Sequence, residues 1–223
     1  MRTVNVGLIR AGTVGCGVIR VLGQNSGIIE KRTGIRLNLA KIADNDPGRK
    51  RPVRIPRKKL VTDAWELIKD DGIDIAVELV GGTDIARDFV LGAIEHGKSV
   101  VTANKALIAH HGKTIFKKAS DKGVSVGFEA SVGGGIPIIL STQQGFAANN
   151  INSIHGIMNG TSNYILSRMT DEGLDFDRVL KEAQAEGYAE ADPSFDVDGI
   201  DAAHKLSIRI MLSFGLFLPF KTI

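Results

Sequence analysis

The chain has 223 residues, of which 43% are hydrophobic and 24% are charged, and its formal net charge is +3. That length suits one large domain or two small ones, and so small a charge does not point to a nucleic acid or a membrane as a partner. The single cysteine, Cys16, excludes an intrachain disulfide and a zinc site made of cysteines. The N-terminal residues read as a strand and not as a signal peptide, so we expect a cytoplasmic protein.

The first half of the chain alternates strand-like and helix-like segments. Apolar runs bounded by turn residues predict strands over residues 4–9, 37–43, 73–80, 99–102 and 124–128. Helical spacing of apolar residues and glycine stops predict helices over residues 13–24, 85–96 and 113–122. Strands that alternate with helices in this way indicate an α/β fold with a doubly wound parallel sheet.

The pattern changes at a glycine-rich connector over residues 131–137. We place a domain boundary at residue 130, which gives a first domain over residues 1–130 and a second over residues 131–223. Residues 151–158 predict one more strand and the remainder is mostly helical, so we expect the second domain to be α+β. The apolar stretch over residues 208–220 is broken by a charge, a glycine and a proline, and it is too short to span a bilayer.

A glycine-rich turn joins the first predicted strand to the first predicted helix. In a G-x-G-x-x-G turn, backbone N–H groups and the helix N-terminus hold the pyrophosphate of a dinucleotide, and the fold is then of the Rossmann type. Gly12 and Gly15 match the second and third glycines of that pattern, whereas Arg10 stands at the first. The Arg10 side chain either contacts phosphate or weakens cofactor binding, and the sequence leaves both open.

The end of the second predicted strand carries the residues that bear on cofactor choice. Asp44 has the position of the acidic residue that bonds a ribose 2′-OH and favours NAD. Residues 49–59 follow with several basic side chains, Arg49 among them, and no acid. Arginines pair well with a 2′-phosphate, so this run is either an NADP-selective clamp or a solvated basic loop. It has no aromatic residues, which makes nucleic-acid binding the weaker interpretation.

A second polar cluster lies over residues 188–205. If a helix starts near Asp198, Asp201 and Lys205 are four residues apart and share one helix face. Such a pair is usually a surface salt bridge. The apolar neighbours of Lys205 instead favour a partly buried pair, an environment that tunes a lysine for acid–base chemistry.

Two shorter segments add candidates. Lys105 follows the strand predicted at residues 99–102, at the end where α/β sheets bind ligands, so it is either a site residue or an ordinary helix-start lysine. The stretch from Glu129 to Pro137 combines one carboxylate with accessible backbone carbonyls. That combination suits either a monovalent cation or a simple hinge.

These segments occur in an order that resembles homoserine dehydrogenase. The resemblance rests on residues 12–15, 101–105, 129–137, 156–165 and 187–205, and it covers essentially the whole chain. The last of these motifs is highly specific, and the glycine turn is much less so. The resemblance implies a Rossmann-type cofactor domain followed by an α+β substrate and dimerisation domain. Because that family's second domain continues well past the equivalent of residue 215, we expect it to be incomplete here.

The resemblance also implies roles for individual residues. Lys205 matches the proton donor and acceptor, Lys105 a lysine near the nicotinamide, and Asp201 a residue that acts with them. The implied substrate-binding residues are Glu190, Gly187, Asp196 and Asp201. With Asp44 and Arg49 included, the expected cofactor-binding residues are Gly12, Thr13, Val14, Gly15, Asp44, Arg49, Thr102, Asn104, Lys105 and Gly187. A sodium site is implied at Glu129 and the backbones of Val132, Gly134 and Ile136.

The implied activity is the NAD(P)-dependent interconversion of L-homoserine and L-aspartate 4-semialdehyde, in threonine, methionine and isoleucine biosynthesis. The expected cofactor is NADP or NAD, with a sodium ion, and the expected partners are the small substrate and a second copy of the chain in a homodimer. Two alternatives remain. One is an oxidoreductase of a related semialdehyde, and the other is an inactive fragment that binds nucleotide without turnover, motivated by Arg10 and the early C-terminus.

Overall fold

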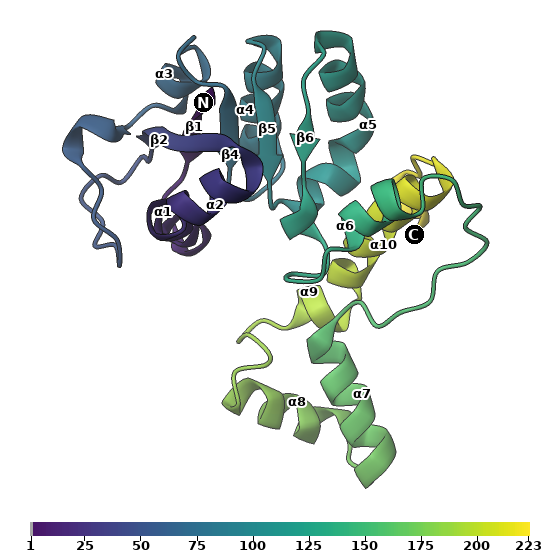
Figure 1. Cartoon of the computed structure of the whole chain (residues 1–223). Helices are drawn as coiled ribbons and strands as arrows, with labels where there is room; N and C mark the ends of the chain where they lie inside the picture. Colours follow the sequence, from purple (N-terminus) through teal and green to yellow (C-terminus); the bar gives the residue numbers. More distant parts are fainter. Residues whose placement is uncertain (1) are drawn as a thin grey trace. The chain divides into compact units, whose positions relative to one another are not determined.

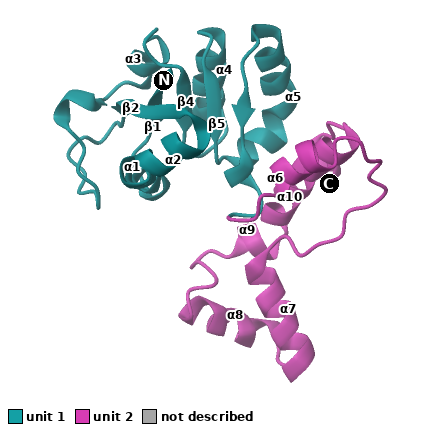
Figure 2. Cartoon of the chain, viewed as in Figure 1, with its two compact units in different colours: residues 1–134 teal, residues 135–223 magenta. Residues whose placement is uncertain are grey.

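The computed structural model describes residues 2–223 and divides into two compact units. Unit 1 runs to Gly134 and unit 2 spans Gly135–Ile223, as Figure 2 shows in teal and magenta. The division falls within the glycine-rich connector, a few residues beyond the boundary placed at residue 130. Among residues 2–223, none of the helices has the length and apolar character that crossing a membrane requires.

Unit 1 is a six-stranded parallel sheet with helices on both faces (Figure 1). Its elements are β1 (Arg2–Ile9), α1 (Thr13–Gln24), α2 (Ser26–Thr33), β2 (Ile35–Ala43), η1 (Arg57–Lys59), β3 (Leu60–Val61), α3 (Ala64–Ile68), β4 (Ile75–Glu78), α4 (Asp84–Glu95), β5 (Ser99–Thr102), α5 (Lys105–Lys122), β6 (Val126–Gly127) and η2 (Glu129–Ser131). The strand order is β3-β2-β1-β4-β5-β6, so the direction of the chain across the sheet reverses between β1 and β4. The α/β doubly wound fold expected from the sequence is confirmed.

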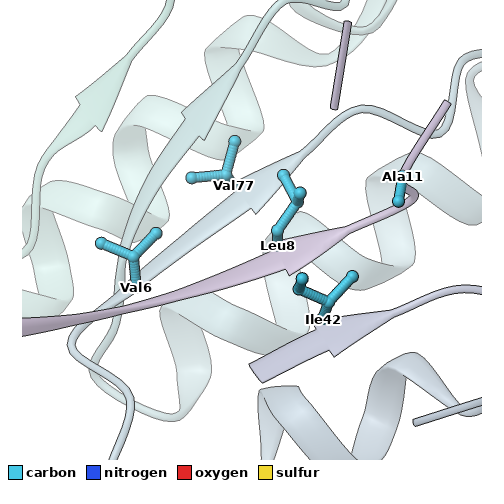
Figure 3. Packing of buried hydrophobic residues seen from close by; sticks show 5 residues of the cluster. All are labelled: Val6, Leu8, Ala11, Ile42 and Val77. Atoms are coloured by element: carbon cyan, nitrogen blue, oxygen red, sulfur yellow. The ribbon is translucent and has the colours of Figure 1, made fainter. Parts of the chain in front are cut away.

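Strand β1 lies at the centre of the sheet, and its successive side chains point to opposite faces, which helices cover. Val6 and Leu8 pack with Ile42 and Val77 from the neighbouring strands (Figure 3), and apolar side chains of α1 cover this cluster. On the opposite face Gly7 leaves room for α3, because a Cβ there would lie 2.6 Å from the Leu67 side chain. The period-2 pattern of a strand thus sends α1 and α3 to opposite faces. Helices therefore cover β1 on both faces of the sheet.

Several elements of unit 1 differ from the sequence prediction. The short strand β3 and the helices α2 and α3 were not predicted, because their apolar runs are too short to give a period. Helix α5 begins at Lys105 instead of residue 113, since the Asn104 side chain accepts from the backbone N–H of Leu107 and caps the helix there. The other predicted strands and helices of this unit are confirmed within a few residues.

In the described chain, unit 2 is built from helices. They are α6 (Ile138–Leu140), the π-turn η3 (Ser141–Gly145), α7 (Gly160–Glu172), α8 (Phe176–Ala185), α9 (Ser194–Val197), α10 (Ile200–Phe214) and η4 (Phe220–Thr222). Its core forms where α7 and α8 pack, around Ile165, Val179, Ala183 and Ala189. The α7–α8 pair and the loop that follows it lead directly to α9 and α10, which carry the polar cluster.

The strand predicted over residues 151–158 is wrong, because this segment forms neither strand nor helix. A strand needs a neighbouring strand for its backbone N–H and C=O groups. Within the described residues, every strand belongs to the sheet of unit 1. The apolar residues of the segment are also unevenly buried, with Ile157 76% exposed, so they do not form the single covered face that the prediction assumed.

Candidate functional site

The turn after β1 is built around a close backbone approach. Arg10 has a φ of 76°, and its amide donates to the Ala43 carbonyl at 2.7 Å, which ties the turn to the end of β2. A Cβ on Gly15 would lie 2.3 Å from the Arg10 carbonyl oxygen, so only glycine fits where α1 packs under the turn. Gly12 is the N-cap of α1 and Thr13 its first residue. This arrangement points the first N–H groups of a helix at a potential anion.

Asp44, at the end of β2, supports the same turn. Its Oδ2 accepts from the Ala11 amide at 2.8 Å and lies 3.1 Å from Nη2 of Arg51, and its Oδ1 accepts from the Asp46 amide at 3.0 Å. Burial works against the charged form, but the two backbone amides and the Arg51 guanidinium outweigh it and hold the pKa of Asp44 below its usual value. Much of the hydrogen-bonding capacity of this carboxylate is therefore already used within the protein.

A cavity of about 520 Å³ lies at the carboxyl ends of β1, β2 and β4. Arg10, Asp44 and Val80 line it from these strand ends, and Ile85 and Phe89 add apolar surface from α4. The sheet reverses its strand order here, between β1 and β4, which is where open α/β sheets bind ligands. The mixed polar and apolar lining of the cavity suits a nucleoside.

A second cavity, of about 240 Å³, opens beside the first turns of α1 and is strongly basic. Its lining includes Arg20 of α1 and the consecutive residues Arg49, Lys50 and Arg51, and Arg49 also lines the larger cavity. The Arg51 side chain is only 6% exposed, and its guanidinium is bound by Asp44 and by backbone carbonyls. Arg51 therefore stabilises the fold and is not available to a ligand. Arg20, Arg49 and Lys50 give the cavity its accessible positive charge.

Glu78, Thr102 and Asn104 form a hydrogen-bonded network at the carboxyl ends of β4 and β5. The buried Thr102 hydroxyl donates to Glu78 Oε2 at 2.7 Å and accepts from the Asn104 amide at 3.0 Å. Asn104 donates through Nδ2 to the Gly82 carbonyl at 2.6 Å, and its Oδ1 caps α5 through the Leu107 amide at 3.0 Å. The network fixes the loop after β4 relative to the start of α5. Glu78 was not predicted, although a lone carboxylate in an apolar strand is a recognisable signal of a buried network.

Lys105 and three of the four predicted cation ligands belong to unit 1. Lys105 is the first residue of α5 and is partly buried. Glu129 begins η2, Val132 is buried, and Gly134 has a φ of 58° that favours glycine. Ile136, the fourth predicted ligand, belongs to unit 2 and is 65% exposed.

The polar cluster of unit 2 centres on Asp201 and Lys205, one turn apart on α10. Lys205 Nζ donates to Asp201 Oδ2 at 2.5 Å and to the Met158 carbonyl at 2.7 Å. Asn159 Nδ2 donates both to Asp201 Oδ2 at 2.9 Å and to Asp196 Oδ1 at 2.7 Å. The side chains of Asp201 and Lys205 are 6% and 22% exposed, which excludes the interpretation as a surface salt bridge. The structure thus shows the Asp201–Lys205 pair that the helical spacing predicted, and Asn159 joins Asp196 to it.

Asn159 is the residue of this cluster that sequence reasoning missed as a site residue. Its Oδ1 accepts from the Ser162 amide at 2.7 Å, so the same side chain caps α7 and bonds both carboxylates. The Ser162 hydroxyl in turn donates to the Asp196 carbonyl at 3.0 Å. An asparagine followed by small polar residues at the start of a helical pattern is an N-cap signal, and that signal was present in the sequence.

The remaining predicted substrate residues lie in the loop between α8 and α9. Gly187 has a φ of 81°, which favours glycine, and it directs the chain out of α8. Glu190 is exposed, and the bond that holds it is through its backbone carbonyl, which accepts from Gln184 Nε2 at 3.1 Å. Its carboxylate makes no hydrogen bond or ion pair to the described residues, so it is open to a ligand.

Two family models together match almost all of the chain. The model described as "Homoserine dehydrogenase, NAD binding domain" matches residues 11–129, and the one described as "Homoserine dehydrogenase" matches residues 137–223. The chain belongs to the homoserine dehydrogenase family. The first match contains Gly12 and Gly15 of the turn, the smaller cavity, the network at Thr102 and the larger cavity except for Ile9 and Arg10. The second match contains the cluster at Lys205.

Homoserine dehydrogenases from several organisms are similar to the chain along its whole length. Those of Pseudomonas aeruginosa and Neisseria gonorrhoeae are 50% and 49% identical over 220 residues, which is 99% of this chain and 50% of each relative. The crystal structure of a homoserine dehydrogenase from Thiobacillus denitrificans has a TM-score of 0.89 and 47% identity, over 99% of this chain and 51% of that one. The chain therefore spans about half the length of the curated relatives that it matches.

A more distant homoserine dehydrogenase structure bears on the cofactor. A hyperthermophilic archaeal enzyme in complex with NADPH has a TM-score of 0.82 and 28% identity, over 96% of this chain and 70% of that one. Together with the match to the NAD-binding domain, it confirms the prediction of a nicotinamide-cofactor domain. The resemblance and the Rossmann-type fold predicted from the sequence are likewise confirmed, and the roles given to single residues stay predictions.

Proposed function

We propose that the chain carries the cofactor and proton-transfer residues of a homoserine dehydrogenase, which interconverts L-homoserine and L-aspartate 4-semialdehyde. The observation that carries this proposal is the partly buried Asp201–Lys205 pair, bound by Asn159, in a member of that family. The reaction requires a hydride donor or acceptor, a proton donor or acceptor at the substrate oxygen, and groups that hold the amino acid. The described residues contain candidates for each requirement except the hydride carrier itself.

The residues of unit 1 fit a nicotinamide dinucleotide, which supplies or accepts the hydride when it is bound. The turn at Gly12, Thr13, Val14 and Gly15 would hold the diphosphate. The absence of a Cβ at Gly15 lets α1 pack against the Arg10 carbonyl, so the N-terminus of the helix lies at the turn. The larger cavity beside Asp44 would hold the adenosine. Thr102 and Asn104 would act by positioning, since their polar groups are engaged with Glu78, Gly82 and Leu107, and Lys105 follows them at the sheet edge.

Lys205 is proposed to move the proton at the substrate oxygen. A charged lysine has three N–H donors, and Asp201 and the Met158 carbonyl take two of them. The third is left to donate to the developing alkoxide when the semialdehyde is reduced. In the opposite direction the uncharged amine accepts the hydroxyl proton of homoserine. Asp201 orients the amine and stabilises its charged form, and Asn159 holds Asp201 in place.

Two carboxylates of unit 2, Glu190 and Asp196, are proposed to hold the amino-acid substrate. Glu190 is exposed and without an ion-pair partner among the described residues, so it is suited to the substrate ammonium. Asp196 is half-buried and bonded to Asn159, which places a second negative charge in the same cluster. Gly187 supports the loop that presents Glu190. This arrangement favours an amino acid over a substrate that lacks the ammonium group.

We further propose NADP as the preferred cofactor. Arg20, Arg49 and Lys50 give the smaller cavity a positive charge that suits a 2′-phosphate. The charge of Asp44, which would repel that phosphate, is already balanced by Arg51. Replacing Arg49 with methionine should therefore weaken NADP binding more than NAD binding, as measured by titration calorimetry. An equal effect on both cofactors would indicate that residues 49–59 form a solvated basic loop and do not select NADP.

Four finer expectations from the sequence also stay proposals. They are a sodium ion held by Glu129 and the backbones of Val132, Gly134 and Ile136, a homodimer, a cytoplasmic location, and a role in threonine, methionine and isoleucine biosynthesis. The sodium site is tested by adding sodium or potassium chloride at equal ionic strength to the activity assay. Equal rates in the two salts would count against it.

The proposed function is tested by following reduced cofactor by absorbance, with L-homoserine and either NAD or NADP at basic pH. Basic pH favours oxidation because that direction releases a proton. Reduction of the cofactor that depends on homoserine supports the proposal and names the cofactor. A folded chain that binds the dinucleotide but leaves homoserine unchanged contradicts the proposal for this chain and favours the non-catalytic alternative.

A further inference from the structure

Arg10 is in a conformation that arginine rarely adopts. Among residues 2–223 it is the one residue other than glycine with a positive φ, at 76°. The left-handed region is unfavourable for a residue with a Cβ, and a glycine at this position of the turn avoids the cost. The bond from its amide to the Ala43 carbonyl and the packing of Gly15 against its carbonyl hold the backbone there. A residue held in such a conformation at a cavity wall suggests a functional use of its side chain.

The Arg10 side chain runs along the edge where a dinucleotide's diphosphate would lie. Its Nε is 3.7 Å from the place that a Cβ on Gly12 would take, at the N-cap of α1. Its Nη1 is 3.6 Å from the place of a Cβ on Gly81 and donates to the Val80 carbonyl after β4. The guanidinium therefore spans from the glycine turn to the loop after β4, across the point where the strand order reverses.

The charge of Arg10 is not neutralised within the described part of the chain. No carboxylate of residues 2–223 forms an ion pair with it, whereas nearby Arg51 is paired with Asp44 and almost fully buried. Arg10 is exposed, lines the larger cavity, and uses one of its five N–H donors on the neutral Val80 carbonyl. Four N–H donors therefore remain for a ligand, and a phosphate suits them because it carries the opposite charge and can accept two parallel bonds from a guanidinium.

We propose that Arg10 is a cofactor-binding residue whose guanidinium pairs with the diphosphate of the dinucleotide. This inference rests on the proposed use of a nicotinamide dinucleotide by this chain. The backbone of Arg10 takes the left-handed angle that the first glycine of the turn ordinarily provides, and the side chain adds a positive charge beside the helix N-terminus. Arg10 thus serves both cofactors alike, whereas Arg49 acts on the 2′-phosphate alone.

The test measures the dissociation constants of NAD, NADP and adenosine 2′-monophosphate by calorimetry for the full chain and three variants. Arg10→Met keeps the length and the strained backbone but removes the charge, and Arg10→Gly also removes the strain. Both should weaken NAD and NADP binding by about tenfold, the value of one modest charge-assisted bond, and leave adenosine 2′-monophosphate unchanged. Arg49→Met is the matched control and should weaken NADP and adenosine 2′-monophosphate instead. Added salt should weaken dinucleotide binding less in Arg10→Met than in the original chain.

The outcomes separate this inference from the proposed function. Dinucleotide binding that is unchanged or tighter in Arg10→Gly overturns it and makes Arg10 an obstacle to the cofactor. A loss of affinity in both Arg10 variants, with melting temperatures at or above the original for Arg10→Gly, supports a charge effect and not unfolding. If the diphosphate effect is present but homoserine is not oxidised, the assignment of Arg10 stands and the proposed function falls. Failure of the original chain to bind either dinucleotide overturns both.

Discussion

Asn159 connects the fold of unit 2 to its polar cluster, so its replacement by alanine tests both. In the structure its Oδ1 caps α7 through the Ser162 amide, and its Nδ2 bonds Asp196 and Asp201 at 2.7 and 2.9 Å. Asn159→Ala removes all three bonds at once in a position that is 8% exposed. A lost cap costs about 1 kcal/mol. A hydrogen bond to a charged group contributes about 1.5–3 kcal/mol when buried, and less where water reaches the carboxylate.

These terms give an expected loss of about 2–4 kcal/mol in the free energy of unfolding of unit 2. The upper end of a simple sum is not reached for two reasons. Asp196 is only half-buried and can be rehydrated, and Asp201 keeps its bond to Lys205. Asn159→Asp is the matched variant, because it keeps an oxygen to cap α7 but replaces the two N–H donors with a third carboxylate. It should be the less stable of the two at neutral pH, and the difference should shrink as the carboxylates are protonated.

The distribution of aromatic residues lets urea unfolding report on each unit separately. The one tryptophan, Trp65, is in α3 of unit 1, and the two tyrosines, Tyr164 and Tyr188, are in unit 2 with ring centroids 4.8 Å apart. Tyrosine near-ultraviolet circular dichroism should show the loss in Asn159→Ala, and tryptophan fluorescence should show little change. A tyrosine transition that stays within about 0.5 kcal/mol of the original chain, the usual range for surface substitutions, would refute this account of Asn159.

The other predictions concern catalysis, the glycine turn and a buried lysine. Lys205→Ala should abolish homoserine oxidation while leaving the dissociation constant of the cofactor nearly unchanged, and normal turnover in that variant would remove Lys205 from the proton-transfer role. Asp44→Asn should lower stability by about 1–3 kcal/mol at neutral pH, because it removes the charged acceptor of the Ala11 amide. The pKa of Asp44 is below its usual 3.8 in the folded protein. The stabilisation that the charged carboxylate provides is therefore fully present above the usual pKa and is lost as the pH falls through the lower pKa of the folded state. The stability difference between Asp44→Asn and the original chain, measured by urea unfolding, should accordingly narrow below about pH 4, and a constant difference would contradict the reasoning. Lys98 is 2% exposed and donates to the carbonyls of Asp70 and Ile73 at 2.6 and 2.9 Å. The Asp70 carbonyl also accepts from the Ile73 amide, so Lys98→Met leaves the buried Ile73 carbonyl without a donor and should shift the tryptophan transition by about 1–3 kcal/mol. An unshifted transition would mean that water replaces the lysine at no cost.

The sheet of unit 1 was predictable because its determinants are local. Long apolar runs at β1, β2, β4 and β5 specify buried parallel strands, and the turn at Gly12 fixes the first crossover. The pairing of Asp201 with Lys205 was predictable for the same reason, since a spacing of four residues places two side chains on one helix face. In the helix pair the sequence separation itself determines the contact, whereas in the sheet it is the strands and helices themselves that local sequence specifies.

What escaped prediction depends on groups that are distant in sequence. The segment 151–158 contains three isoleucines, which favour a strand, but composition supplies no partner strand, and none is present in the described part of unit 2. Asn159 and Asp201 are separated by 42 residues, so their bond follows from the packing of α7 on α9 and of α9 on α10 and not from any local pattern. Glu78 likewise acquires its partner, Thr102, from a neighbouring strand. The sequence nevertheless contained N-cap signals at Asn104 and Asn159. Such signals indicate polar side chains that a hydrogen bond to the start of a helix holds in one position.

Asp44 illustrates how partners decide what a residue type means. An acidic residue at the end of the second strand normally favours NAD, because its carboxylate bonds the ribose hydroxyl and repels a 2′-phosphate. Here the charge is balanced by Arg51, and the oxygens bond the amides of Ala11 and Asp46, so the residue stabilises the turn that faces the diphosphate. The smaller cavity beside it carries an accessible positive charge from Arg20, Arg49 and Lys50. Cofactor preference in this chain should therefore follow substitutions of Arg49, while substitutions of Asp44 should lower stability and the affinity for both dinucleotides together.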